Sequence, residues 1–366
     1  MIKVEPPGVG DLSRLARYES GGITTFAANT NRGKRSIQID LSTDEGVGIV
    51  LDLFARADVV VQAMRPGVVD RLGIGYEHAR RVNPSLVYCS LSGYGPDGPH
   101  ADRPVYDPIL QARAGYVAIQ VNPEIPIPDL VRNAVVDKAA GWSVANAVLA
   151  ALFARERGAG GQHVEVAMLD AAVAFLWPDA GAPHTLVDVD AEGTPLSQIY
   201  QLTPTADGHL VYFVITDAQF CGLYRALGRP HWCEDERYAT HAGRTAPGRY
   251  EELGAELAAA FLEWPTDRLV DRLHAEGVPA ARVQGVGELP DDPQIRHNAT
   301  FAEWVHPRMG RIRQPRPVAR FSATPTTTPT LIDRAGEHTD AILTELGLDE
   351  AERRRLRDAG VVAGPT

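Results

Sequence analysis

The sequence is poor in lysine, in cysteine and in uninterrupted hydrophobic runs. Lys3, Lys34 and Lys138 are its only lysines, and 36 basic against 47 acidic side chains leave a formal net charge of −11. This balance argues against a nucleic-acid-binding surface, which would show a basic stripe. No apolar run is long enough to span a bilayer and no secretory signal peptide is recognisable. We therefore expect a cytoplasmic protein with neither nucleic-acid nor membrane partners.

The scarcity of cysteine limits two kinds of site. Cys89, Cys221 and Cys233 are too few and too scattered for a disulfide framework. His231, Cys233 and His241 lack the spacing of metal ligands. We expect ordinary side chains at these positions and no bound metal.

The length and the hydrophobic pattern predict an α/β fold. A chain of 366 residues with 44% apolar residues has the size of two domains or one large one. Short β-branched segments alternate with helical segments, which predicts a parallel sheet with helices on its faces. The expected strands cover residues 2–5, 34–41, 58–64, 85–92 and 162–168, and the expected helices include residues 42–57, 135–157 and 169–178.

The pattern changes near residue 194. A strand pair around Asp207-Gly208 and three amphipathic helices predict a smaller α+β domain. We expect the large domain to comprise residues 1–193 and, after the small domain at 194–297, to resume with residues 298–366 and the tail.

The stretch GYGPDG at 93–98 matches the dinucleotide-binding template G-x-G-x-x-G. That template requires its last glycine to open a helix. Pro96, Pro99, Pro104 and Pro108 disfavour a continuous helix here. The stretch is therefore predicted to be a loop at the carboxyl end of a strand, where ligands of such folds bind.

The segment from Val135 to Arg157 predicts the strongest helix, and it is apolar on nearly every face, as in a buried helix. Asp137 lies at its N-cap or in its first turn. It has a structural interpretation, as a cap for unpaired backbone N–H groups. It also has a catalytic one, as an anion stabilised by the helix dipole that attacks a thioester. Spacing does not choose between the two.

Several segments together resemble the family III coenzyme A transferases, which include the formyl-CoA and carnitine CoA-transferases. They occur in the order NRGKRSIQIDL, MRPGVVDRLG, YGPDGPHADRPVYDPILQARAG, VVDKAAG, ERGAGGQHVEVAMLDAA, PTADGHLVYF, GRP, GVPAARV and GEHT. The resemblance runs from Met1 to about Gly347.

The resemblance implies a Rossmann-like large domain with a parallel sheet, a smaller α+β domain and an interlocked homodimer. It places the nucleophile at Asp137, which would carry an aspartyl-CoA thioester between an acyl-CoA donor and a free carboxylic acid acceptor. No cofactor is expected to be bound permanently, because the coenzyme A thioester is itself a substrate.

The same matching implies further site residues. Tyr106, Asp107 and Gln111 are expected at the acyl site, where Asp107 either assists catalysis or only caps the next helix. Residues expected to bind coenzyme A, as a local cationic set on an acidic protein, are Lys34, Arg35, Met64, Arg65, Arg71 and Arg103.

Two alternatives stay open. The wider family includes α-methylacyl-CoA racemases, which need a histidine where this chain has Tyr106, and His100 is six residues too early. A tyrosine with an ordinary pKa is a poor base at neutral pH. The second alternative is a catalytically silent coenzyme A-binding or scaffold protein.

The chain departs from the family pattern in three places. Family members usually begin about thirty residues earlier with a strand, a Gly-Pro turn and a helix, so we expect a longer native protein. Gln62-Ala63-Met64 replaces the usual Glu-Asn-aromatic triplet. No glycine-rich loop precedes PTADG, which leaves formyl or oxalate chemistry unsupported.

Overall fold

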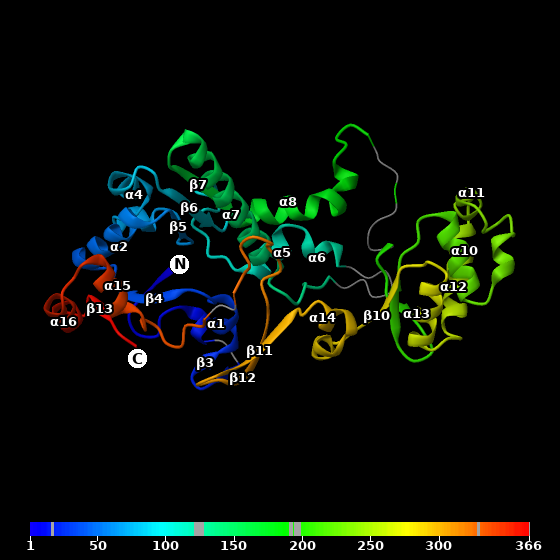
Figure 1. The fold of residues 1–366 in the computed structure, drawn as a ribbon. Helices are drawn as coiled ribbons and strands as arrows, with labels where there is room; N and C mark the ends of the chain where they lie inside the picture. Colours follow the sequence, from blue (N-terminus) through cyan, green and yellow to red (C-terminus); the bar gives the residue numbers. More distant parts are fainter. Residues whose placement is uncertain (16–17, 121–127, 190–192, 194–198, 328–329, 366) are drawn as a thin grey trace. The chain divides into compact units, whose positions relative to one another are not determined.

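The computed structural model describes residues 1–15, 18–120, 128–189, 193, 199–327 and 330–365. The chain packs as two compact units (Figure 1). Unit 1 comprises Met1–Gln120, Pro128–Ala182 and Pro293–Thr366, and unit 2 contains Pro183–Asp292. The division into domains expected from the sequence stays a prediction, and its boundaries after residues 193 and 297 fall later in the chain than those of unit 2.

The strands of unit 1 form two three-stranded sheets and two hairpins. They are β1 (Ile2–Glu5), β4 (Arg35–Ile39) and β13 (Val362–Ala363); β5 (Val59–Gln62), β6 (Val87–Ser92) and β7 (Gln162–Ala167); β2 (Glu19–Ser20) with β3 (Ile23–Thr24); and β11 (Phe301–His306) with β12 (Gly310–Pro315). Pairing is parallel between β1 and β4, β5 and β6, and β6 and β7, whereas β13 joins β4 antiparallel.

The mixed α/β class with parallel strands is as expected. The Rossmann-like arrangement and the interlocked dimer stay predictions, because the described strands order as β1-β4-β13 and β5-β6-β7 without a pairing that joins the two sheets.

The helices of unit 1 follow the predicted alternation with strands. They are α1 (Thr25–Thr30), α2 (Asp44–Arg56), α3 (Val68–Arg71), α4 (Tyr76–Val82), α5 (Asp107–Arg113), α6 (Tyr116–Ile119), α7 (Val135–Ala154), α8 (Met168–Ala180), α14 (Pro293–His297), α15 (Thr339–Leu346) and α16 (Glu350–Asp358), with a short 3-10 turn η1 (Leu12–Leu15). Thr43 caps α2 by accepting a hydrogen bond from the backbone N–H of Gly46. Helix α8 continues past Pro178, where the sequence predicted its end.

Two apolar clusters hold unit 1 together. The first joins β4, β6, α2, α15 and α16 through residues such as Ile37, Tyr88 and Leu343. The second joins α5, α7 and α8 through Leu110, Val136 and Ala172. Because Val136 immediately precedes Asp137, this second cluster fixes the start of α7 against α5.

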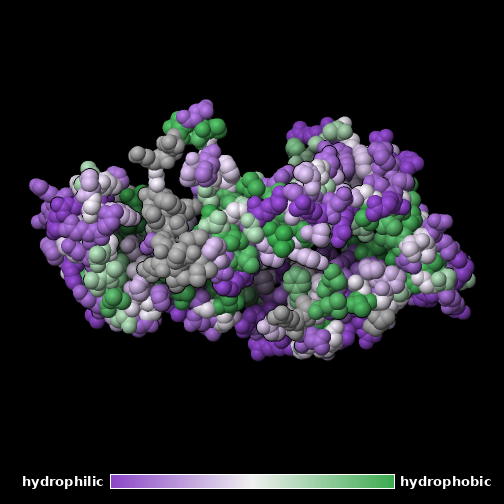
Figure 2. All heavy atoms as spheres, turned by 180° about the vertical axis from the view of Figure 1, so that it is seen from behind, coloured by the Kyte–Doolittle hydropathy of each residue, from purple (hydrophilic) through white to green (hydrophobic). Residues whose placement is uncertain are grey.

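Helix α7 is not buried on all sides, contrary to its sequence pattern. Trp142 is 72% exposed, and Leu149 and Phe153 are each 63% exposed. Hydrophobic side chains reach the surface in patches of the face shown in Figure 2. By length and composition alone, Val135–Ala159 could cross a membrane, which the sequence did not lead us to expect. The core helix of a soluble protein can have the same length and composition, so one such helix is weak evidence for a membrane span. A π turn (η2, Arg155–Ala159) with Gly158 at φ 95° follows α7, close to the end that the sequence predicted at residue 157.

The GYGPDG segment is a loop, as predicted. It follows β6, and no helix begins before α5 at Asp107. At Gly93 an added Cβ would lie 2.1 Å from Cγ1 of Val105, so only glycine lets the two ends of the loop pack this closely. The loop therefore leads the chain from the carboxyl end of β6 into α5.

Unit 2 is a small α+β unit. Its elements are β8 (Thr203–Pro204), β9 (His209–Tyr212), α10 (Asp217–Ala226), η4 (Pro230–Cys233), α11 (His241–Arg244), α12 (Arg249–Phe261), α13 (Thr266–Ala275), β10 (Ala280–Arg282) and η5 (Val286–Asp291), with η3 (Ala182–His184) at its start. The antiparallel sheet β10-β9-β8 packs through Leu210 against an apolar cluster that includes Leu223, Phe261 and Leu269.

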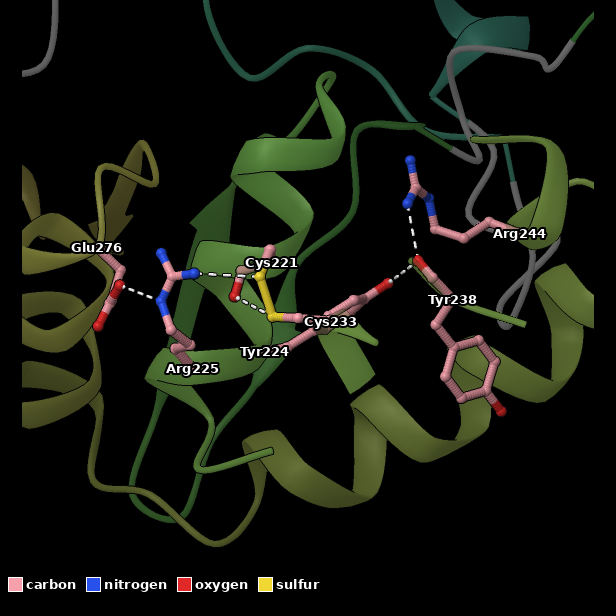
Figure 3. Close-up of a disulfide and its surroundings, with 7 residues drawn as sticks. All are labelled: Cys221, Tyr224, Arg225, Cys233, Tyr238, Arg244 and Glu276. Carbon is pink, nitrogen blue, oxygen red and sulfur yellow. Dashed lines mark hydrogen bonds and ion pairs between the residues drawn. A yellow bond between two sulfur atoms is a disulfide. The ribbon is translucent and has the colours of Figure 1, made fainter. Parts of the chain in front are cut away.

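Unit 2 contains a disulfide between Cys221 and Cys233, with a sulfur–sulfur distance of 1.97 Å (Figure 3). The expectation of ordinary cysteines is wrong at these two positions. Their separation of 12 residues gave no signal, because the turn after α10 that brings η4 back alongside that helix is a tertiary feature. Cys89 is free and buried in β6.

Candidate active site

Asp137 is the third residue of α7, in its first turn. The N-cap residue is Ala134, which has no side chain able to accept a hydrogen bond from the first backbone N–H groups. The helix therefore needs an acceptor from elsewhere in the chain.

Asp107 supplies that acceptor. Its Oδ2 accepts hydrogen bonds from the backbone N–H of Val136 at 2.7 Å and of Asp137 at 3.0 Å. Its side chain is buried, with 6% of the residue exposed. The sequence left open whether Asp107 only caps the next helix; although Asp107 begins α5, its carboxylate caps α7, whose start is about thirty residues later.

Gln111 fixes Asp107 and the segment that precedes α7. Its Nε2 donates to Oδ1 of Asp107 at 2.5 Å and to the carbonyl oxygens of Val131 and Asn133 at 3.1 Å each. Its Oε1 accepts from the N–H of Val131 at 2.9 Å. Only 2% of Gln111 is exposed, so these bonds form away from bulk water and hold the geometry firmly.

Asp137 as a residue is exposed, although its carboxylate has lost part of its hydration. Within the part of the chain that the structure describes, no hydrogen bond or ion pair to that carboxylate is found. Partial loss of hydration raises its pKa, the negative charge of Asp107 raises it further, and the neighbouring Lys138 lowers it. The helix dipole would favour the anion, but Asp107 already occupies two of the N–H groups that create the positive helix end.

This arrangement gives Asp137 the properties of a nucleophile. A carboxylate with few stabilising partners and a raised pKa is more basic than an ordinary one, and it is free to attack an electrophilic carbonyl. The Asp107 carboxylate, by contrast, accepts three hydrogen bonds. The two neighbouring carboxylates therefore differ in their surroundings: Asp107 is fixed by hydrogen bonds, whereas the Asp137 carboxylate is available to react.

Tyr106 is the N-cap residue of α5, and its ring is largely solvent-exposed. Its side chain makes no capping hydrogen bond. The described structure thus brings Asp107, Gln111 and Asp137 together and leaves Tyr106 beside them at the surface.

Lys138 was not among the site residues inferred from the sequence. Its Nζ hydrogen-bonds Oδ1 of Asn133, and its charge acts on Asp137. The signal was available, because Lys138 is one of only three lysines and directly follows Asp137.

The six residues expected to bind coenzyme A lie in two groups, one at the amino end of a strand and the other in segments that follow the carboxyl ends of strands. Lys34 and Arg35 lie at the amino end of β4, where Lys34 hydrogen-bonds Asn31 and Arg35 forms an ion pair with Glu345. Met64, Arg65 and Arg71 follow the carboxyl end of β5 and are exposed, and so is Arg103 in the loop before α5. Among the described residues no hydrogen bond or ion pair joins the first group to the second.

Two surface depressions lie in unit 1. One, of about 710 Å³, is lined by Arg113 of α5 and by apolar residues of α8 that include Val173 and Trp177. The other, of about 680 Å³, lies between α1 and residues 317–327. Asp137 lines neither of these two depressions. No group of His, Cys, Asp and Glu side chains within the described ranges could hold a metal ion.

Comparison with known proteins gives a consistent result. The model of CoA-transferase family III matches residues 1–339. The chain is 32% identical to the succinyl-CoA:glutarate CoA-transferase of Mus musculus, with 99% of this chain and 84% of the relative covered. It is 32% identical to the succinyl-CoA–D-citramalate CoA-transferase of Chloroflexus aurantiacus, covering 99% of this chain and 91% of that one.

A solved structure agrees with these relatives. The crystal structure of Rv3272 from M. tuberculosis superimposes with a TM-score of 0.80 at 32% identity, covering 93% of this chain and 90% of the other.

Proposed function

The chain belongs to CoA-transferase family III, and we propose that it transfers coenzyme A from an acyl-CoA to a free carboxylic acid through an intermediate on Asp137. One observation carries the proposal: an exposed carboxylate with a raised pKa in the first turn of α7, held in place by a separate, buried carboxylate. The relatives are named CoA-transferases, which favours transfer over a racemase or a silent scaffold.

The proposed reaction proceeds in balanced steps. The Asp137 carboxylate attacks the thioester carbonyl, which forms a mixed anhydride and releases the coenzyme A thiolate. The thiolate then attacks the Asp137 side of the anhydride, which gives an aspartyl-CoA thioester and releases the donor carboxylate. An incoming carboxylate reverses both steps, so that the new acyl-CoA leaves and the Asp137 carboxylate is restored.

The residues around Asp137 would assist in defined ways. Asp107 and Gln111 fix the backbone of the first turn of α7, which would restrict the positions that the nucleophile can adopt. Arg65, Arg71 and Arg103 would supply positive charge to the phosphates of coenzyme A. Lys34 and Arg35 remain proposed contacts, but Arg35 would have to exchange Glu345 for a phosphate.

The covalent intermediate can be tested directly. Incubation with succinyl-CoA, the donor named for two relatives, followed by hydroxylamine and peptide mass spectrometry, should convert Asp137 to its hydroxamate. Modification of another carboxylate, or none while turnover continues, would contradict the proposal. Exchange of an α-hydrogen of the acyl group with solvent deuterium, without hydroxamate, would identify a racemase instead.

We also propose that the enzyme works as an interlocked homodimer. Trp142, Leu149 and Phe153 expose an apolar face along α7, and single soluble chains rarely leave such a surface uncovered. A second copy is the occupant that the family resemblance implies.

Placing charges on this face should prevent the dimer from forming. The double change Leu149→Glu with Phe153→Glu buries two carboxylates in the proposed interface, and we expect association to weaken by on the order of 100-fold or more, with loss of activity. Light scattering after size-exclusion chromatography measures the mass. Val286→Glu, at a comparably exposed apolar residue of unit 2, is the control. A double variant that remains dimeric and active would show that α7 is not the interface.

A further inference from the structure

The disulfide of unit 2 joins two elements on one side of the unit. Cys221 lies in α10 and Cys233 ends η4, and both residues are half-buried (Figure 3). Trp232, next to Cys233, packs edge-on against Tyr224 of α10 at 5.5 Å between ring centroids. The two elements are therefore held together by apolar packing as well as by the covalent bond.

The surroundings of the two sulfur atoms differ. Arg225, one helical turn after Cys221, places its Nη1 at 3.1 Å from Cys221 Sγ. Its Nε is bonded to Glu276 at 2.6 Å, which orients the guanidinium toward the sulfur. Among the described residues, no positively charged group is bonded to Cys233 Sγ. Glu276 offsets part of the positive charge, but the Nη1 donor remains directed at Cys221.

This asymmetry determines how the bond would react with a thiol. A cation beside a cysteine stabilises its thiolate, and a sulfur with a more stable thiolate leaves faster in exchange. An attacking thiolate would therefore bond to Sγ of Cys233 while the sulfur–sulfur bond breaks and Cys221 leaves as a thiolate beside Arg225.

We propose that Cys221–Cys233 is a reversible thiol-exchange site, at which a low-molecular-weight thiol forms a mixed disulfide with Cys233. A second thiol molecule completes the reduction: it attacks the mixed disulfide, releases the small-molecule disulfide and leaves two protein thiols. In reverse, a small-molecule disulfide oxidises the pair. Coenzyme A and glutathione share the required chemistry. The exchange needs only a thiolate and does not depend on the proposed acyl transfer.

The reduced pair would keep its geometry. Cys233 Sγ lies 3.4 Å from the carbonyl oxygen of Cys221, within reach of a thiol hydrogen bond. The hydroxyl of Tyr224 donates to the carbonyl of Tyr238, and Arg244 donates to the same carbonyl. These contacts hold the chain on either side of η4, so the sulfurs stay adjacent and the bond can form again.

The test uses the whole purified protein and two thiols in separate arms, coenzyme A and glutathione. Reduction is followed by alkylation and mass spectrometry. We expect Arg225→Gln to slow cleavage by either thiol about threefold to tenfold and Arg225→Lys to restore most of the rate, because lysine keeps the charge. Equal rates in all three proteins, or a disulfide inert to both thiols, would overturn the proposal.

A trapping experiment tests whether Cys233 can carry the mixed disulfide. In Cys221→Ser, coenzyme A disulfide or glutathione disulfide should leave a stable adduct on Cys233. Buried Cys89, whose pKa is raised by burial, serves as the internal control and should stay unmodified. An adduct on Cys89 alone would contradict the assignment. Asp137→Asn should exchange like the unchanged protein, so failure of the acyl-transfer proposal is seen separately.

Discussion

Asp137→Asn should abolish acyl transfer, with a loss of roughly 10³-fold or more in kcat, as removal of a covalent nucleophile does in other enzymes. An amide is not nucleophilic toward a thioester, and the neighbouring carboxylate of Asp107 is already engaged by three hydrogen bonds. Steady-state kinetics and the hydroxylamine experiment both report the loss.

The same change should not destabilise the protein at neutral pH. The pKa of Asp137 is raised in the folded chain, so the folded state binds the proton more tightly than the unfolded state does. Its anion therefore opposes folding at pH values above that pKa, and replacing it with a neutral amide removes this cost. Thermal unfolding at pH 7 should show an equal or slightly higher midpoint.

Asp170→Asn is the matched control for this prediction. Asp170 is the third residue of α8, as Asp137 is of α7, and it is also exposed. We expect near-normal turnover for this variant. Activity above about a tenth of normal in Asp137→Asn would rule out covalent catalysis at this residue, because an asparagine amide cannot act as the nucleophile in its place.

Changes at Asp107 should have the second largest effect, and they should affect both stability and activity. Asp107→Ala leaves the backbone N–H groups of Val136 and Asp137 without their acceptor and removes one of the acceptors of the Gln111 amide. Loss of hydrogen bonds to a buried charge predicts destabilisation of about 2–3 kcal/mol. Because the first turn of α7 carries the nucleophile, we also expect kcat to fall by on the order of 100-fold.

Asp107→Asn separates the effect of the Asp107 charge from the effect of its size and hydrogen bonding. The amide retains one acceptor but loses the negative charge that raises the pKa of Asp137. Because the reaction requires the anion, the acid limb of the kcat/KM profile should move to lower pH. The pKa of Asp137 should still lie above that of an ordinary aspartate, because its partial loss of hydration, the larger cause of the shift, remains.

Asp102→Asn, in the exposed part of the same loop, removes one charge without touching α7 and should leave the acid limb in place. An unmoved limb in Asp107→Asn would show that Asp107 acts on the fold alone.

Local signals in the sequence predicted most elements. The β-branched segments became β4, β5, β6 and β7, and the proline-rich loop formed where the prolines excluded a helix. The position of Asp137 in the first turn of α7 also followed from the start of an apolar segment. These features depend on neighbouring residues, which is why a single sequence reveals them.

Other features depend on contacts that no local pattern records. The cap on α7 comes from Asp107, about thirty residues upstream, and neither residue's neighbours indicate the pairing. The Cys221–Cys233 bond depends on where η4 packs. The exposure of Trp142 could not be predicted because an apolar sequence pattern does not distinguish a helix face in the core from one at the surface.

The pairing of β13 with β4 affects how the protein is made. Ile39 emerges early from the ribosome, but its partner Val362 is translated more than three hundred residues later. Unit 2, a nearly continuous segment, can fold during synthesis, whereas the sheet of unit 1 that contains β4 must wait until β13 has been translated. During that delay one edge of β4 is open to other chains, so slow translation or high expression should favour aggregation of the nascent protein.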